Sequence, residues 1–260
     1  MIITINGLIN KIPIIKKIYS KILIFILSSR DEFITNFKDI RLHINIKDPI
    51  DKIIFFTNEY EEKQTNFLHQ WIKVNNPNIF IDVGANFGIY SLRISKLFKT
   101  LKIIAFEPVL TTFNKLKSNI KINNLEKKIK IYNIGLSNTS GLKKMIALKR
   151  RDYVQSGGFS FYIPKKKLTD EDVIEYHNTI MGDQVLKFKK KNIVIKIDVE
   201  VYENEVLLGM KNLLKNNKIL LQIEIFDRNF RKTNKFLLKN KFKLINKIKK
   251  TSDYFYINYK

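Results

Sequence analysis

Short apolar runs alternate with amphipathic segments from residue 79 onward. Apolar runs of four to eight residues predict strands, and apolar positions recurring every three or four residues predict helices. The predicted strands are 79–83, 101–106, 129–134, 192–198 and 219–225, and the predicted helices are 89–98, 110–123, 203–214 and 230–238. Strands alternating with helices of this length indicate an α/β fold built on a doubly wound parallel sheet. Residues 242–248 and 254–259 favour a closing hairpin.

The remaining segments are less regular and divide the chain into parts. We assign residues 1–30 to an apolar, basic helix, 31–77 to an N-terminal cap region, and 78–260 to the main domain. The cap shows strand-like runs at 41–46 and 52–57 and a helix-like segment at 59–74.

An irregular insert at about 149–191 interrupts the main domain. Its centre, 155–162, places paired glycines beside aromatic and hydroxyl side chains. Loops of this kind often bind substrate. A hairpin whose aromatic side chains only pack against the domain fits the same residues.

The clearest chemical signal lies at residues 79–91, where an apolar strand leads into two glycines and then a helix. Gly84 and Gly88 can adopt backbone angles that other residues avoid, and they let a ligand approach the main chain. The amides at the start of the next helix direct partial positive charge toward such a ligand. We therefore expect cofactor contacts from Asp82, Gly84, Asn86 and Gly88.

A second apolar run, 103–106, ends at Glu107 and Pro108. A carboxylate there can accept both hydroxyls of a ribose, and the carboxyl ends of parallel strands meet in one crevice. The glycine loop lacks the middle glycine of the dinucleotide fingerprint G-x-G-x-x-G, which gives a pyrophosphate room. A cofactor without a pyrophosphate fits better, and S-adenosylmethionine is such a cofactor.

Carboxylates also follow the strand at 192–198. Asp198 and Glu200 come at its end, and Glu224 ends the neighbouring predicted strand. Burying carboxylates is costly without a partner or a task. We expect Asp198 or Glu200 to be the base that takes a proton from a hydroxyl acceptor, or the group that orients it. No His and carboxylate spacing indicates a metal site, although Asp198 and Glu200 could together hold a divalent ion.

The composition narrows the classes of partner. The formal net charge is +24, and only seven of the 48 basic residues are Arg. Lysines spread over every element indicate a solvated surface, because nucleic-acid readers tend to concentrate Arg at base and phosphate contacts. The absence of cysteine excludes disulfides, thiol catalysis and cysteine-ligated metals.

Residues 1–30 do not predict a membrane span. The clean apolar run, 22–27, is far shorter than the about 20 residues that a spanning helix needs. Two interpretations remain for this helix: an interfacial helix on an anionic membrane, and a helix packed against the domain or a partner. We expect a cytoplasmic protein, with peripheral contact at the inner membrane face if the first interpretation holds.

Several of these motifs resemble, in order, those of the FkbM family of S-adenosylmethionine-dependent methyltransferases. They are Phe80-Ile-Asp-Val-Gly-Ala-Asn-Phe-Gly88, Ala105-Phe-Glu-Pro108, Lys117-Ser-Asn-Ile-Lys-Ile-Asn123, Leu136-Ser137, Ile197-Asp-Val-Glu200 and Val206-Leu-Leu-Gly209. The similarity extends from about Tyr60 and Glu61 to Glu224. It departs from the family at Val201, where a glycine usually follows the Asp-Val-Glu triplet.

This resemblance implies a class I methyltransferase fold: seven strands, mostly parallel, with the last strand antiparallel. It implies O-methylation of a hydroxyl on a sugar, a glycan or a secondary metabolite. By position, Gly84, Asn86 and Gly88 would contact the cofactor and Glu107 its ribose. The turn from Gly135 to Ser137 would lie near the adenine.

The basic charge motivates two alternatives. A nucleic-acid methyltransferase is one, but no motif resembling Asn-Pro-Pro-Tyr follows the fourth strand to position a flipped base. A non-catalytic, Lys-rich protein that binds anionic lipid or glycan is the other. We expect a small-molecule or glycan acceptor and no nucleic acid.

Overall fold

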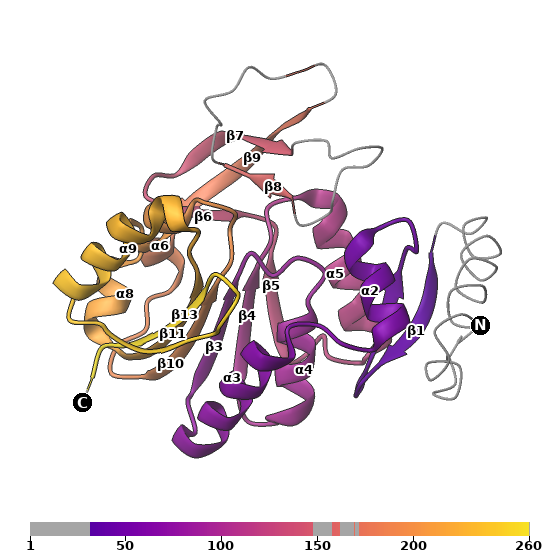
Figure 1. Ribbon diagram of the computed structural model, residues 1–260, viewed down its shortest axis with the longest axis horizontal. Helices are drawn as coiled ribbons and strands as arrows, with labels where there is room; N and C mark the ends of the chain where they lie inside the picture. Colours follow the sequence, from indigo (N-terminus) through magenta and orange to yellow (C-terminus); the bar gives the residue numbers. More distant parts are fainter. Residues whose placement is uncertain (1–31, 148–157, 162–168, 170–171, 260) are drawn as a thin grey trace.

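A computed structural model describes residues 32–147, 158–161, 169 and 172–259. Its centre is a seven-stranded sheet in the order β12-β13-β11-β10-β3-β4-β5 (Figure 1). The strands are β3 (Ile79–Val83), β4 (Lys102–Phe106), β5 (Ile129–Tyr132), β10 (Asn192–Ile197), β11 (Lys218–Glu224), β12 (Lys243–Lys247) and β13 (Asp253–Ile257). Neighbouring strands pair in parallel except at β13, which is antiparallel to β11 and β12. The predicted class I methyltransferase sheet is confirmed.

Helices cover both faces of this sheet because its strands are apolar on both sides. One face carries α3 (Glu62–Asn75), α4 (Ile89–Leu97) and α5 (Leu110–Ile122), and the other carries α7 (Glu203–Leu208), α8 (Lys211–Asn216) and α9 (Asp227–Lys239). Consecutive residues of β3 enter different cores. Phe80 packs in the first core, whereas Ile79 and Ile81 pack in the second.

The single helix predicted at 203–214 is divided into α7 and α8. Gly209 lies between them, packed against β6 (Gly135–Ser137). A Cβ atom on Gly209 would lie 1.8 Å from the carbonyl oxygen of Ser137. The close approach of the two backbones thus ends α7. The hydrophobic pattern of the sequence does not reveal such a contact.

A second, smaller sheet lies at the carboxyl end of the main sheet (Figure 1). Its order is β6-β9-β7-β8, with β7 (Gly141–Ala147), β8 (Phe159–Ser160) and β9 (Val173–Met181), and the short helix α6 (Gly182–Val185) follows β9. The interpretation of 149–191 as irregular is wrong for β9. This strand pairs with β6 on one side and β7 on the other, so its order depends on partners distant in sequence.

The N-terminal region contains a hairpin, β1 (Phe33–Phe37) and β2 (Ile40–Ile44), followed by α2 (Pro49–Thr57) and α3. The strand expected at 52–57 is wrong, because these residues form the end of α2. Asp48 caps α2, accepting a hydrogen bond from the Ile50 amide at 2.8 Å, and Pro49 occupies its first turn. Asp-Pro is a typical start of a helix, but the apolar residues that follow it had suggested a strand.

The predicted helix at 1–30 and half of the loop at 155–162 lie outside the described residues. Within the described ranges, no helix has both the length and the apolar character required to cross a bilayer.

Candidate active site

A cavity opens at the carboxyl ends of β3, β4, β10 and β11. The strand order reverses between β3 and β10, so the connections from these two strands leave in opposite directions. Open parallel sheets bind ligands at such a point. Met145 and Phe159 of the small sheet, with Phe161 just after β8, complete the wall.

The glycine loop between β3 and α4 forms the floor of this cavity. Gly84 and Gly88 both have positive φ, at +79° and +93°. A Cβ on Gly84 would lie 1.9 Å from the carbonyl oxygen of Asp198, and one on Gly88 would lie 2.4 Å from a methyl carbon of Leu116. Neighbouring backbone therefore requires a glycine at 84, and a side chain crowds position 88. The ligand-based prediction did not include these reasons.

Glu107 follows β4 directly and is 6 % exposed. Its Oε2 accepts from the Asn86 amide at 2.9 Å, and its Oε1 accepts from the Val109 amide at 3.0 Å. Burial raises the pKa of Glu107 to about 7, although the two amides lower it. Each oxygen can accept a further hydrogen bond, so two adjacent hydroxyls match this carboxylate.

Asp82 and Asn86 offer further polar atoms to the cavity. Asp82 Oδ2 accepts from the Ser91 hydroxyl at 2.7 Å. Among the described residues, neither Asp82 Oδ1 nor Asn86 Oδ1 has a hydrogen-bond partner, although both are buried. Burial raises the pKa of Asp82. Buried polar atoms are rarely left unsatisfied, and these two fit donor groups of a ligand.

Three carboxylates gather across the ends of β10 and β11. Asp198, Glu200 and Glu224 each place an oxygen within 4.8 Å of the others, so the group could hold a divalent ion. The sequence had paired only the first two for this purpose. Burial and the neighbouring Asp198 raise the pKa of Glu224 to about 10.

Lys196 supplies the positive charge next to this group. It is 4 % exposed in β10, and its Nζ lies 2.8 Å from Asp198 Oδ2. Burial disfavours ionisation of Asp198, but the Lys196 ammonium lowers its pKa below the usual value. Asp198 is therefore the ionised member of the pair that it forms with Glu224.

The turn after Asp198 keeps its shape without a glycine. Glu200 and Val201 have φ of +51° and +76°, in the left-handed region that glycine favours. The Val201 amide donates to Glu203 Oε1 at 2.8 Å, and Ser160 Oγ donates to the Glu200 carbonyl. These contacts hold a β-branched residue in an unfavourable conformation.

The structure separates Gly135 from Ser137. Gly135 lines the cavity, where a Cβ would lie 2.7 Å from the ring of Phe161. Ser137 is buried outside the cavity lining, with its hydroxyl 2.9 Å from that of Tyr202. All other predicted site residues line this one cavity.

Comparison with known proteins matches residues 82–244, more than half of the chain, to the methyltransferase FkbM domain. The chain belongs to the FkbM methyltransferase family. A curated relative, methyltransferase sdnD of Sordaria araneosa, is 25% identical over 178 residues, covering 58% of this chain and 67% of that protein.

Solved structures of other methyltransferases are similar in backbone only. Human methyltransferase 10 domain containing protein matches with a TM-score of 0.48 and 11% identity, covering 93% of this chain and 95% of that one. Precorrin-6y C5,15-methyltransferase from Geobacter metallireducens matches with a TM-score of 0.44 and 11% identity, covering 76% and 88%.

The lining of this methyltransferase includes Tyr60, Glu61 and Lys196, to which the sequence-based prediction gave no role. Lys196 could have been found, because a lysine inside an otherwise apolar strand is a signal for a buried ion pair. Tyr60 and Glu61 precede α3, outside the alternating pattern. The family resemblance begins at these two residues, but it assigned them no role.

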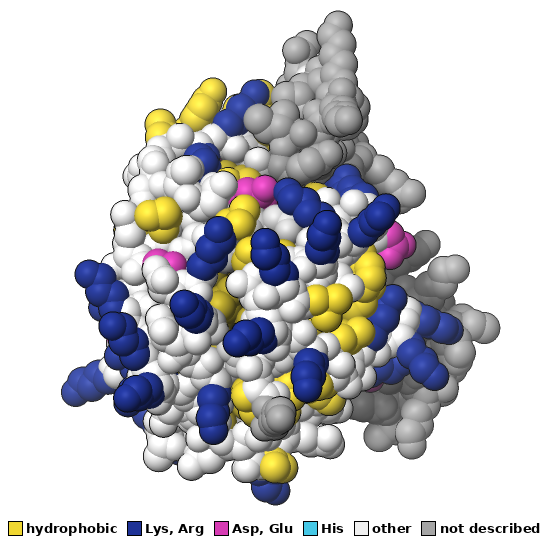
Figure 2. Space-filling view, turned by 90° about the vertical axis from the view of Figure 1, so that its left-hand side faces the viewer, with side chains coloured by type: hydrophobic (Ala, Val, Ile, Leu, Met, Phe, Trp, Pro, Cys, Tyr) yellow, Lys and Arg dark blue, Asp and Glu magenta, His cyan; other side chains and the backbone are white. Residues whose placement is uncertain are grey.

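The charge of the cavity is opposite to that of the chain. Among the residues that the structure describes, the lining contains one lysine, Lys196, and six acidic side chains, Glu61, Asp82, Glu107, Asp198, Glu200 and Glu224. On the outer face shown in Figure 2, Lys and Arg side chains are scattered singly between other residues. The net charge of +24 therefore describes the surface and not the site.

Proposed function

We propose that this protein is an S-adenosylmethionine-dependent O-methyltransferase that acts on a hydroxyl of a sugar, a glycan or a secondary metabolite. The observation that carries the proposal is Glu107, a carboxylate fixed by two backbone amides at the cavity edge, next to the glycine loop. Membership of the FkbM methyltransferase family supports the class of reaction.

The residues present fit this cofactor. Glu107 would accept the ribose hydroxyls, Asp82 and Asn86 would contribute oxygens without a partner among the described residues, and Gly135 would lie near the adenine. When bound, S-adenosylmethionine supplies a methyl group on a positively charged sulfur. The acidic lining favours a cationic donor.

The remaining task of the protein is to place and deprotonate the acceptor. Holding the acceptor in line can supply roughly 7–11 kcal/mol of the acceleration. Asp198 or Glu200 would accept the hydroxyl proton as the methyl group is transferred. Lys196 keeps Asp198 ionised for this role, and Glu224 faces it in the protonated form.

Transfer of a labelled methyl group from S-adenosylmethionine to cell-surface glycan extracts tests the reaction. We expect label in a glycan fraction with the native chain, and a loss of at least about 100-fold with Asp198→Asn, in the range typical of a general base. Absence of label in every hydroxyl-containing fraction would contradict the proposed reaction. Glu62→Gln is a control, because that carboxylate pairs with Lys38 away from the site.

The two alternatives have less support. A nucleic-acid substrate would bring phosphates toward a cavity whose described lining carries six acidic side chains and one lysine, which is unfavourable. In a non-catalytic protein that binds lipid or glycan, the buried ion pair of Lys196 with Asp198 would have no function.

A further inference from the structure

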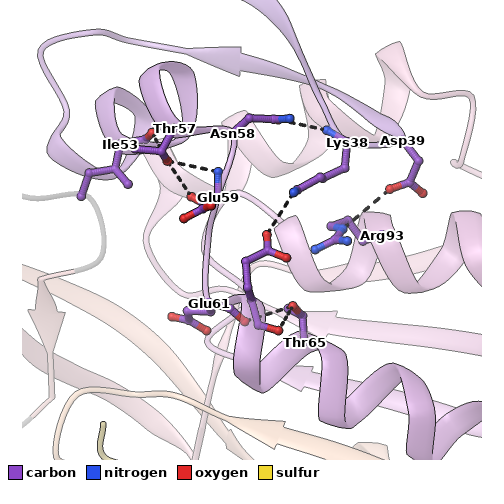
Figure 3. Close-up of polar contacts among 10 residues, drawn as sticks. Lys38, Asp39, Ile53, Thr57, Asn58, Glu59, Glu61, Thr65 and Arg93 are labelled. Atoms are coloured by element: carbon purple, nitrogen blue, oxygen red, sulfur yellow. Dashed lines mark hydrogen bonds and ion pairs between the residues drawn. The ribbon is translucent and has the colours of Figure 1, made fainter. Parts of the chain in front are cut away.

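Glu61 enters the cavity from the cap region, immediately before α3. Its backbone is left-handed, with φ of +47°, and its carbonyl accepts from the Thr65 amide and hydroxyl at 2.9 and 3.0 Å. Figure 3 shows its carboxylate pointing away from Lys38 and Thr65. The next residue, Glu62, instead pairs with Lys38 at 3.4 Å.

A chain of buried hydrogen bonds fixes this carboxylate. Glu61 Oε2 accepts from the Tyr90 hydroxyl at 2.6 Å, and that hydroxyl accepts from Gln222 Nε2 at 3.1 Å. Asp253 then accepts from Gln222 at 3.3 Å and from Gln64 at 2.9 Å. Residues from α3, α4, β11 and β13 thus position one oxygen of Glu61, which is more order than a surface carboxylate requires.

Tyr60 also hydrogen-bonds to the Glu61 carboxylate, and a carboxylate that accepts from two hydroxyls can still accept from a further donor. No described Lys, Arg or His nitrogen lies within 4.0 Å of the Glu61 carboxylate, and Lys196 pairs with Asp198 instead. Burial raises the pKa of Glu61, although the nearby Lys196 ammonium lowers it. A cationic donor in the cavity would stabilise it.

Glu61 and Glu107 contact the segment from the glycine loop to α4 at different points. Glu107 bonds to Asn86 within the loop, whereas Glu61 bonds to Tyr90 in the first turn of α4, after the loop. A ribose held at Glu107 would direct the amino-acid part of the cofactor across the loop. We propose that Glu61 binds the ammonium group of the methionine part of S-adenosylmethionine, an inference that rests on the proposed function.

Two ligands separate this role from a structural one. S-adenosylhomocysteine carries the ammonium group, whereas 5′-methylthioadenosine shares its adenosine and sulfur but lacks the amino acid. In Glu61→Gln the amide oxygen can still accept from Tyr90, so only the charge is lost. We expect calorimetry to show S-adenosylhomocysteine binding weakened by at least about 10-fold, the scale of a hydrogen bond to a charged group, with 5′-methylthioadenosine binding unchanged.

Every outcome decides the assignment. Glu62→Gln should bind both ligands as the native chain does, because its carboxylate belongs to the surface pair. Equal weakening of both ligands in Glu61→Gln would make Glu61 structural, and no weakening of either would remove it from the cofactor site. If the native chain bound neither ligand, the proposed function itself would fail.

Discussion

Gly84 and Gly88 share a backbone conformation but differ in what surrounds them. A methyl group on Gly84 would meet backbone, the Asp198 carbonyl, whereas one on Gly88 would meet a movable Leu116 side chain. We expect Gly84→Ala to lower the free energy of unfolding by roughly 2–4 kcal/mol, and Gly88→Ala by less. Urea denaturation of both variants measures this difference, and equal losses would refute the backbone contact.

Glu107 should make cofactor binding depend on pH. Its pKa in the folded protein is about 7, above the usual 4.5, because it is buried. Only the ionised carboxylate accepts both ribose hydroxyls, so affinity should rise as the pH increases through 7. Well below 7 it should fall by up to about tenfold per unit. Calorimetry across this range should show the slope in the native chain but not in Glu107→Gln; a flat native profile argues against the ribose role.

Chelation tests whether the cluster of Asp198, Glu200 and Glu224 holds a divalent ion. We expect turnover to withstand EDTA, because the Lys196 ammonium and a proton on Glu224 already offset two negative charges. The measurement is the methyl-transfer rate before and after chelation. Loss of activity that Mg²⁺ restores would assign the three carboxylates to a divalent ion.

At the scale of elements, the sequence predicted the helices and strands whose positions depend on the local hydrophobic pattern. Strands β3, β4, β10 and β11 are buried apolar runs, so their positions and the sheet follow from periodicity. Strand β9 and the break at Gly209 depend on pairing and close approach between distant segments. The hydrophobic pattern along the chain does not reveal those contacts.

Helix α2 offers a prediction about such a missed element. Asp48 accepts from the Ile50 amide at the start of the helix. Removing this cap with Asp48→Ala should lower the free energy of unfolding by about 1 kcal/mol. Urea denaturation would measure the loss, and Asp48→Asn, which retains a capping oxygen, should recover most of it. An unchanged midpoint in the alanine variant would mean that the cap is not stabilising.

At the scale of the whole molecule, folding segregates charge. The surface is rich in lysine, while the described part of the cavity lining collects six acidic side chains from segments between Glu61 and Glu224. The sequence predicted which strands deliver Asp82, Glu107 and Asp198, because carboxyl ends of parallel strands share one edge. The family resemblance began at Tyr60 and Glu61 but gave Glu61 no role, because its position depends on a hydrogen bond from Tyr90, which lies on another element.

The central claim is that this cavity binds S-adenosylmethionine through the carboxylate after β4. Isothermal titration calorimetry of the full chain with S-adenosylmethionine, alongside Glu107→Gln with its fold checked by circular dichroism, tests it most directly. We predict saturable binding at one site per chain in the native protein, and a loss of at least about 10-fold in the variant. No binding to the native chain, or equal affinity in a folded variant, would contradict the account.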